Sequence, residues 1–242
     1  MEPTKNKMQI EIWSDIMCPF CYIGKRKFEK ALEGFVNKDN VEIIWKSYQL
    51  APEMKTSPGK TIHQYLSEHK GVSMNEAKRM NDYVTDLAAK SGLVYNFDKA
   101  VVANSFNAHR LIHLAGKHGK QNEIKEKLLA AYFTEGKNVD DLDTLVKIGI
   151  EAGLHTDEVK AALASDAYAN EVMDDIDEAN QIGVNGVPFF VFNRKYAISG
   201  AQESQSFTQA LETSFADWKR IKAITELEVT EGPVCTPEGD CK

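Results

Sequence analysis

The chain has 242 residues, of which 43% are hydrophobic and 27% charged, and its formal net charge is −7. This is the balance of an ordinary globular protein with enough apolar surface for a core, so a disulfide scaffold is not needed. The acidic charge argues against a general nucleic-acid binder, which would carry a basic footprint. No run of 18 apolar residues is present, so we expect no membrane span.

The N-terminal residues give no sign of export. Residues 1–7 are not followed by an apolar segment of the kind found in secretory signals, because Met8 to Trp13 is short and includes polar residues. We therefore expect a cytoplasmic protein.

The chain begins with a strand–helix–strand pattern. Met8 to Ser14 alternates between apolar and polar residues, which predicts a strand. Pro19 suits the first turn of a helix, and apolar residues continue at helical spacing as far as Phe35. Val41 to Leu50 predicts a second strand. A right-handed crossover would make the two strands parallel.

A loop is predicted at residues 51–60, and a long helical region follows it. The expected helices are Ile62–Lys70, Met74–Ser91, Asn104–His118, Asn122–Phe133, Asp141–Ala152, Thr156–Ala164 and Ala167–Gln181. The pattern then returns to two short strands, Phe189–Phe192 and Tyr196–Ser199, and to a helix at Ser204–Trp218.

This order of elements predicts an α/β protein, a thioredoxin-like fold with a large inserted all-helical domain. We assign residues 1–50 and 183–220 to the thioredoxin-like domain and residues 51–182 to the helical insertion. Residues 221–242 form a C-terminal tail that carries a second cysteine pair.

The four cysteines form two pairs, and the first pair lies where a strand meets a helix. In Cys18-Pro19-Phe20-Cys21, the helix N-terminus favours a thiolate at Cys18, and Cys21 lies one helical turn further on. This placement predicts a redox-active dithiol in which Cys18 attacks and Cys21 resolves the mixed disulfide. Half of a zinc site and an inert pair are the alternatives.

The Val187-Pro188 bond directly precedes a predicted apolar strand. In a thioredoxin-like fold this position is a cis-proline loop that faces the dithiol, and an ordinary trans-proline at a strand start is the alternative. We predict that Val187 and Pro188, together with Pro19 and Phe20, form the substrate-binding surface.

Several segments together resemble a known family. The segment Trp13–Gly24 resembles the DsbA-like thioredoxin family, specifically its FrnE-like branch, and Gly183–Phe190 resembles the cis-proline loop of that branch. Ser199–Gln202 is similar to the turn that follows, and Asn104 with Ala108–Leu111 is similar to a helix motif of the inserted domain. The resemblance covers residues 8 to 215 and implies dithiol–disulfide exchange on proteins.

Two departures from the family bear on the direction of the reaction. Phe20 stands where many periplasmic members have a histidine that stabilises the reduced thiolate, so we expect a milder oxidant. Export signals, common in the family, are not recognised here. Because the cytosolic glutathione pool is reducing, reduction or isomerisation of protein disulfides is as well supported as net oxidation.

Two other functions remain open at this point. The 2-hydroxychromene-2-carboxylate isomerases and kappa-class glutathione transferases share the fold, use glutathione and keep a single Ser or Cys nucleophile, so Cys21 counts against them. A zinc-binding, chaperone-like protein without enzymatic activity is the second alternative. For the favoured function the partners are protein thiols and disulfides, with glutathione as a candidate reductant, and no bound cofactor or metal is required.

A few further residues carry weaker expectations. Cys235 and Cys241 are candidates for an auxiliary redox pair, with a static disulfide or no role as alternatives. His109 and Arg110 are candidates for an interdomain contact near the dithiol, or else a packing pair. Lys25 and Arg26 are expected to add positive potential near Cys18. The remaining lysines of note are expected on a solvated face: Lys117, Lys120, Lys125 and Lys127.

Overall fold

The computed structural model describes residues 7–225, and its centre is a four-stranded sheet in the order β2-β1-β5-β6. The strands are β1 (Met8–Ser14), β2 (Val41–Ser47), β5 (Phe189–Phe192) and β6 (Tyr196–Ser199). β2 runs parallel to β1, whereas β5 runs antiparallel to it. The parallel pairing expected of a right-handed crossover is therefore confirmed.

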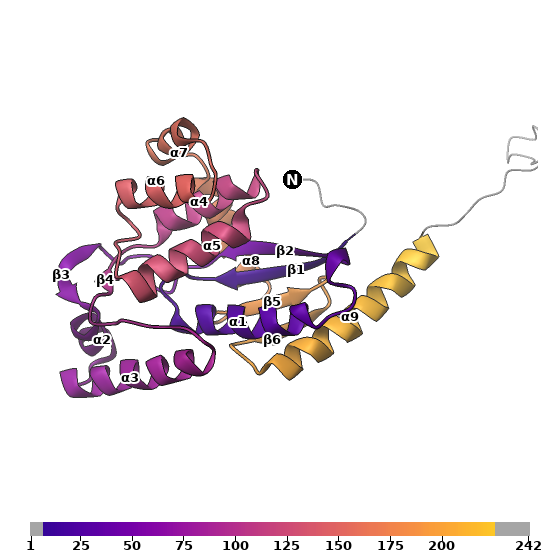
Figure 1. Cartoon of the computed structure of the whole chain (residues 1–242), viewed down its shortest axis with the longest axis horizontal. Coiled ribbons are helices and arrows are strands. Elements are labelled where there is room, and N and C mark those ends of the chain that lie inside the picture. Colours follow the sequence, from indigo (N-terminus) through magenta and orange to yellow (C-terminus); the bar gives the residue numbers. More distant parts are fainter. Residues whose placement is uncertain (1–6, 226–242) are drawn as a thin grey trace, which may run out of the picture.

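Helices cover both faces of this sheet (Figure 1). On one face lie α1 (Pro19–Glu33) and α9 (Ser204–Thr225). Phe190, which pairs with Ile12 across the ladder, contacts Phe28 of α1 and Phe207 of α9, with ring centroids 5.5 and 4.7 Å apart. The alternation read from the sequence thus directs Ile12 and its neighbours Met8 and Ile10 into this layer.

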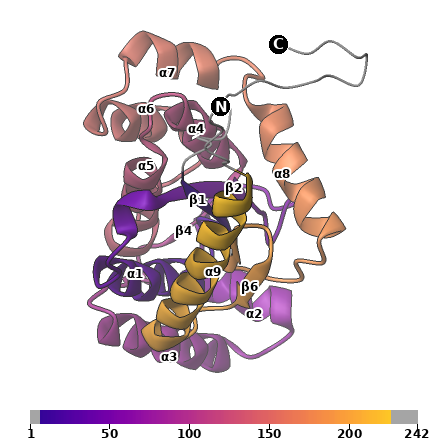
Figure 2. The same ribbon diagram turned by 90° about the vertical axis from the view of Figure 1, so that its right-hand side faces the viewer.

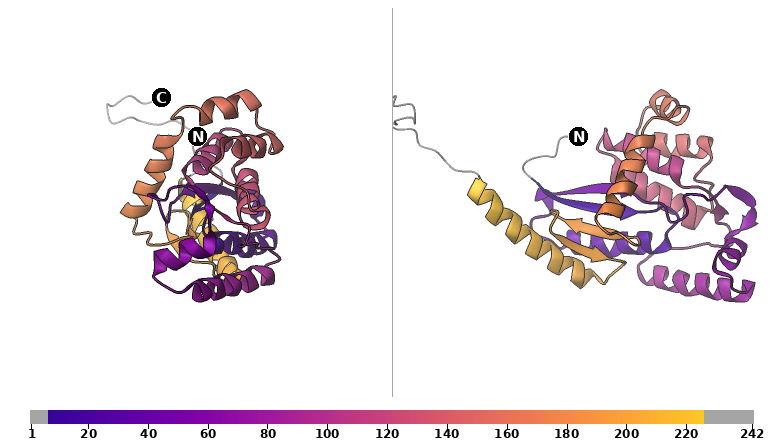
Figure 3. Two further views of the ribbon diagram at one scale, coloured as in Figure 1. Left: turned by 90° about the vertical axis from the view of Figure 1, so that its left-hand side faces the viewer. Right: turned by 180° about the vertical axis from the view of Figure 1, so that it is seen from behind.

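The opposite face of the sheet is covered by α8 (Ala169–Gln181). Figure 2 shows α8 on the other side of β1 and β2 from α1, and Figure 3 shows it crossing the strands when the molecule is seen from behind. Trp13 is fully buried here with Ala179, and its Nε1 donates a hydrogen bond of 2.9 Å to Asp175 O. Both faces of β1 are therefore inside the protein.

The segment between β2 and α8 forms the other helices, and each helix predicted for it is confirmed. They are α2 (Ile62–Lys70), α3 (Met74–Lys90), α4 (Phe106–Gly116), α5 (Gln121–Ala130) with a following π-helical turn (Ala131–Glu135), α6 (Leu142–Glu151) and α7 (Thr156–Leu163). Ser73 and Asp141 begin α3 and α6, because each side chain accepts a hydrogen bond from a backbone N–H three residues later. A short 3-10 helix (Lys38–Asn40) precedes β2.

The inserted segment is not entirely helical. A two-stranded antiparallel sheet joins β3 (Ser57–Thr61) to β4 (Val101–Val102), where the sequence predicted only a loop. Proline and glycine are rare inside strands, yet β3 contains Pro58 and Gly59. The pairing register also shifts between Ser57 and Thr61. Local sequence signals of this kind indicate a loop, and only the partner 40 residues away makes the segment a strand.

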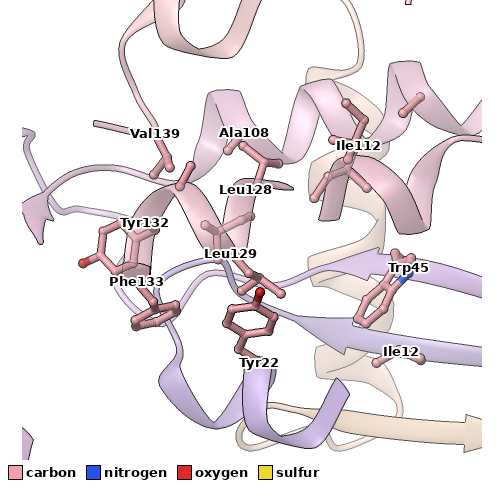
Figure 4. Close-up of a cluster of buried hydrophobic side chains, with 14 of the residues drawn as sticks. Ile12, Tyr22, Trp45, Ala108, Ile112, Leu128, Leu129, Tyr132, Phe133 and Val139 are labelled. Carbon is pink, nitrogen blue, oxygen red and sulfur yellow. The ribbon is translucent and has the colours of Figure 1, made fainter. Parts of the chain in front are cut away.

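The sheet and the inserted helices share one core (Figure 4). Ile12 and Trp45 of the sheet and Tyr22 of α1 belong to the same buried cluster as Leu128 of α5 and Phe133 of the π-helical turn. Because burial of apolar area is the main favourable contribution to folding, the two parts of the chain stabilise each other.

The observed architecture is the predicted thioredoxin-like fold with a helical insertion. The proposed domain boundaries stay a prediction, and two helices lie across or near them. α8 precedes residue 183 but packs on the sheet, and α9 continues past residue 220 to Thr225. Within residues 7–225 no helix combines the length and apolar character that a bilayer crossing requires.

Candidate active site

The first cysteine pair lies where β1 ends and α1 begins, as the sequence predicts. Cys18 is the N-cap residue of α1 and Pro19 is its first residue, and Cys21 N donates a 3.0 Å hydrogen bond to Cys18 O. Both cysteines are free thiols and are only 4% and 1% exposed. Phe20 is 39% exposed, so it belongs to the outer surface beside the dithiol.

The Val187–Pro188 loop faces this dithiol. The bond between the two residues is cis, and Val187 O accepts a hydrogen bond from Cys18 Sγ at 3.4 Å. Gly200 N donates to Pro188 O at 2.8 Å, which holds the loop to the end of β6. The predicted position of the loop is therefore confirmed, while its role in binding substrate remains a prediction.

Gly24 allows α1 and this loop to approach each other closely. A Cβ atom at residue 24 would lie 2.9 Å from Pro188 Cγ and 3.5 Å from Ala201 Cβ. Glycine inside a helix costs about 1 kcal/mol of helix stability relative to alanine. A glycine at such a position therefore suggests that close packing requires it. In the sequence Gly24 is recognisable only as part of the family motif, and its contact with the loop becomes visible in the fold.

Lys125 of α5 is the most important residue that sequence analysis misplaced. It is fully buried, so the expectation of a solvated face is wrong for this lysine. Its Nζ donates a 3.2 Å hydrogen bond to Ser14 O and lies 5.4 Å from the centroid of the Trp45 ring. Lys125 lies three and seven residues before Leu128 and Tyr132, on the same buried face of the helix. This spacing is the sequence signal that could have predicted the burial of Lys125.

The two thiols have different electrostatic surroundings. The hydrogen bond with Cys21 and burial raise the pKa of Cys18. Burial also raises the pKa of Cys21, but the hydrogen bond from Cys18, the ammonium of Lys125 and the hydroxyl of Ser14 lower it below its ordinary value. The thiol hydrogen of Cys18 thus lowers the pKa of its neighbour, and Lys125 adds a positive charge behind the pair. The attacking role of Cys18 stays a prediction.

Asp15 and His109 connect the loop before Cys18 to the inserted helix α4. Asp15 accepts hydrogen bonds from the backbone N–H groups of Leu50, at 2.9 Å, and Met17, at 3.3 Å, and its Oδ1 lies 3.5 Å from His109 Nε2. Burial raises the pKa of Asp15, but the interactions with His109 and Leu50 lower it, and burial lowers the pKa of His109. A carboxylate and a neutral imidazole therefore lie beneath the active-site loop.

Arg110, the neighbour of His109, makes a different kind of contact. Its guanidinium donates hydrogen bonds to carbonyl oxygens at the end of α7 and in the following turn, those of Ala162, Ser165 and Ala167. All of these lie in the inserted segment, so for Arg110 the structure shows the second alternative, a hydrogen-bonded packing residue, and not an interdomain contact. The planar group instead satisfies carbonyls that the end of α7 leaves without helical partners.

Lys25 and Arg26 do not present free positive charge to the dithiol. Lys25 Nζ lies 2.7 Å from Glu126 Oε2, and Arg26 also pairs with Glu126. Tyr22 donates a 2.6 Å hydrogen bond to the same carboxylate, and Glu29 pairs with both basic residues. These contacts join α1 to α5, and their charges largely cancel.

A Ser–His–Asp cluster elsewhere does not have the geometry of a nucleophilic triad. Ser47 Oγ and Asp175 Oδ2 lie 3.0 and 3.1 Å from the same nitrogen, His113 Nε2. A triad needs the serine and the acid on different ring nitrogens. Asp175 also binds Lys46 and Ser47 N, so this cluster joins α8 to β2 and α4.

The second cysteine pair, Cys235 and Cys241, lies outside the described residues, and its predicted redox role stays a prediction. Within residues 7–225 no group of three or more His, Cys, Asp or Glu side chains is arranged to hold a metal ion. A zinc site built from both cysteine pairs would need the tail residues.

A family model described as "DSBA-like thioredoxin domain" matches residues 9–212, a range that includes the dithiol and the cis-proline loop. The chain belongs to this family. The DsbA-like assignment is therefore confirmed, whereas the FrnE-like branch is not specifically tested. The family assignment makes the chain a thioredoxin-fold protein of the thiol–disulfide oxidoreductase type.

Three known proteins resemble this chain over most of its length. A solved structure of a probable DsbA oxidoreductase from Streptomyces coelicolor is 38% identical, covers 97% of this chain and 98% of its own, and superposes with a TM-score of 0.81. The uncharacterized protein YwbO of Bacillus subtilis is 28% identical over 216 residues, covering 84% of this chain and 96% of YwbO. The cytosolic disulfide reductase DsbM of Pseudomonas aeruginosa, solved with GSH, is 14% identical with a TM-score of 0.59, over 88% of this chain and 99% of DsbM, and shows the shared fold alone.

Proposed function

We propose that this DsbA-like protein exchanges thiols and disulfides on protein substrates through Cys18 and Cys21. The observation that carries the proposal is the position of Cys18: its Sγ lies at the N-terminus of α1 and contacts Val187 O at 3.4 Å. Helix N-termini favour thiolates, and a backbone carbonyl beside the sulfur is a partner for an extended peptide.

The reaction takes place in two exchange steps. The Cys18 sulfur, having passed its proton to Cys21, attacks one sulfur of a substrate disulfide, and the other substrate sulfur leaves as a thiolate and takes up a proton. Cys21 then gives up the proton that it received and attacks Cys18 Sγ as a thiolate. The second substrate sulfur leaves and takes up a proton, so that a substrate thiol is released and a Cys18–Cys21 disulfide forms. Two electrons pass from the protein to the substrate.

Binding of the substrate involves the surface around the dithiol. Phe20 is exposed beside it and offers apolar contact, while Val187 offers backbone hydrogen-bonding groups. Pro19 and Pro188 restrict the backbone on the two sides of the sulfurs. A surface of this kind binds the backbone and apolar side chains of an unfolded segment without a strict sequence requirement.

Glutathione is the proposed small-molecule reductant, and the cytoplasm the proposed compartment. Two molecules of glutathione restore the dithiol and leave as glutathione disulfide. Where the glutathione pool is mostly reduced, the protein would therefore reduce or isomerise protein disulfides. The histidine that stabilises a strongly oxidising member of the family is replaced by Phe20, which supports this direction.

The test compares wild type with Cys18→Ser and Cys21→Ser in insulin reduction and in the refolding of a scrambled disulfide protein. We expect Cys18→Ser to lose both activities and Cys21→Ser to accumulate a mixed disulfide with substrate at Cys18. Full activity in Cys18→Ser would contradict the proposal. Saturable glutathione binding and glutathione-dependent catalysis that survive Cys21→Ser would instead support the isomerase or transferase alternative.

A further inference from the structure

Two lysines are buried close to the dithiol helix, and they differ in their partners. Lys25 is 2% exposed and pairs with two carboxylates, those of Glu29 and Glu126. Lys125 is 0% exposed and forms no ion pair with a carboxylate among residues 7–225. A buried ammonium without a counter-charge is costly, and buried lysines of this kind are associated with proton transfer. The counter-charge of Lys125 must therefore come from groups that are not in direct contact with it.

The surroundings of Lys125 indicate which groups these are. Its Nζ is held by Ser14 O, at 3.2 Å, against the face of the Trp45 ring. The titratable groups that act on it come from the β1–α1 loop, α1 and α4, and they are Asp15, Cys18, Cys21, Lys25 and His109. Burial lowers the pKa of Lys125 to about 8, and the charges of Cys21 and then of Asp15 are the strongest of those that raise it. A fraction of Lys125 is therefore neutral near pH 7.

One polar atom without a well-formed hydrogen bond belongs to the residue that holds Lys125. Among the described residues, three buried side-chain atoms have no well-formed hydrogen bond: Ser14 Oγ, His109 Nε2 and Tyr132 Oη. Ser14, whose carbonyl oxygen accepts the hydrogen bond from Lys125, carries the first of these atoms, and the second lies 3.5 Å from Asp15 Oδ1. Buried polar groups are normally satisfied, so each of these atoms needs an explanation.

We propose that Lys125 is the proton acceptor and counter-ion of the resolving thiol Cys21, an inference that rests on the exchange reaction proposed above. In the mixed disulfide, Cys21 is a thiol shielded from solvent and must lose its proton before it can attack. The proton passes to the neutral amine of Lys125, which leaves a thiolate beside an ammonium ion.

The rest of the step balances within the site and its substrate. The Cys21 thiolate forms a bond to Cys18 Sγ, the bond from Cys18 to the substrate sulfur breaks, and the substrate thiolate takes a proton from solvent. Lys125 then returns its proton to solvent. In the reduced, resting pair, the same ammonium stabilises the charge shared by the two sulfurs.

The first experiment measures the Cys21 thiolate directly. In full-length protein with Cys18, Cys235 and Cys241 changed to Ser, Cys21 is the one remaining thiol, and its absorbance at 240 nm is followed against pH. We expect Lys125→Met to reduce the thiolate fraction at pH 7 by about tenfold or more, which corresponds to one pKa unit. Lys127→Met, two residues further along α5 and more exposed, is the matched control and should titrate as its parent.

A second measurement separates the charge of Lys125 from its ability to accept a proton. Lys125→Arg retains a cation but has no neutral form near pH 7. In otherwise wild-type protein we expect it to keep the Cys21 thiolate while slowing resolution of a preformed mixed disulfide, and to flatten the dependence of that rate on pH near 8. Formation of the mixed disulfide should change less than its resolution.

An unchanged Cys21 titration in Lys125→Met would overturn the proposal, provided that the thermal melting curve shows a folded protein. If that variant does not fold, Lys125→Gln takes its place in the same titration. The titration requires no substrate, so its failure is distinguishable from failure of the proposed function. If the protein shows no exchange activity but its Cys21 pKa still depends on Lys125, the proposed function is contradicted, while the electrostatic effect of Lys125 on Cys21 stands.

Discussion

Gly24 lies in α1 at the point where the helix meets the ring of Pro188. The site depends on this contact because a displaced loop would move Val187 O away from Cys18 Sγ, which are 3.4 Å apart. The pyrrolidine ring can change only its pucker, which gives it far less freedom than the end of a flexible side chain, so an added atom at residue 24 presses on the loop.

Gly24→Ala is therefore expected to slow disulfide exchange without unfolding the protein. Alanine is favoured in helices by about 1 kcal/mol, but its Cβ would lie 2.9 Å from Pro188 Cγ, and overpacking costs about 1 to 3 kcal/mol. We expect a variant no more stable than wild type, with insulin reduction several-fold slower. Gly34→Ala, at the end of the same helix with its nearest neighbour 3.8 Å away, is the control and should keep full activity.

At the scale of elements, α5 positions the active-site helix by contacts on two sides. Lys125 approaches the dithiol from the interior, and Glu126, the next residue, joins Tyr22, Lys25 and Arg26 nearer the surface. Consecutive residues of a helix point about 100° apart, so one turn of α5 contacts both the core side and the outer side of α1. The thioredoxin-like part of the chain thus contributes the dithiol helix, and the inserted segment contributes the charge of Lys125 behind it.

Removal of the Glu126 charge should weaken this attachment. Burial raises the pKa of Glu126, but the hydrogen bond and charge interactions with Arg26 and Lys25 lower it to about 2. Its stabilising contribution is thus complete above the unfolded value near 4.5 and is lost as the pH falls toward 2. We expect Glu126→Gln to lower the free energy of unfolding at pH 7 by about 1 to 3 kcal/mol, reduced by the partial exposure of the carboxylate.

Denaturant titrations at several pH values between 2 and 7 test this expectation. The difference between wild type and Glu126→Gln should shrink as the pH falls below 4.5. Glu123→Gln, one turn earlier and paired only with Lys120 at the surface, is the matched control. A constant difference across the whole pH range would mean that packing, and not charge, is lost in the variant.

For the whole molecule, the shared core makes the inserted helices part of the site rather than an accessory to it. Tyr95, in the segment after α3, donates a 2.7 Å hydrogen bond to Pro19 O, while α4 contributes His109 and α5 contributes Lys125. The residues that tune the dithiol therefore come from three parts of the insertion, and a thioredoxin-like core alone would lack them.

Exchange between the tail cysteines and the dithiol is the prediction that concerns the whole chain. A linked thiol pair has an effective concentration of the order of millimolar, so at about 0.1 mM glutathione it would compete with the free reductant. We expect Cys235→Ser/Cys241→Ser to slow re-reduction of the Cys18–Cys21 disulfide several-fold at this concentration. Thr236→Ala is the control, and identical re-reduction rates at all glutathione concentrations would contradict the relay.

Much of the fold could be predicted because its signals are local. Alternation in Met8–Ser14, helical spacing after Pro19 and caps such as Ser73 depend on neighbours a few residues apart. The two strands Ser57–Thr61 and Val101–Val102 could not be predicted in this way, because pairing across some 40 residues, and not local propensity, creates them.

The sequence by itself determined the dithiol, its helix N-terminus and the proline loop, because covalent spacing and backbone stereochemistry specify all three. Only the tertiary structure decided what surrounds the sulfurs. Lys125 is 104 residues from Cys21 along the chain, and its charge matters because burial removes the water that would screen it. The sequence shows a lysine at position 125, and only the folded core shows that it is buried beside the dithiol loop, with its Nζ hydrogen-bonded to Ser14 O and no carboxylate paired with it among residues 7–225.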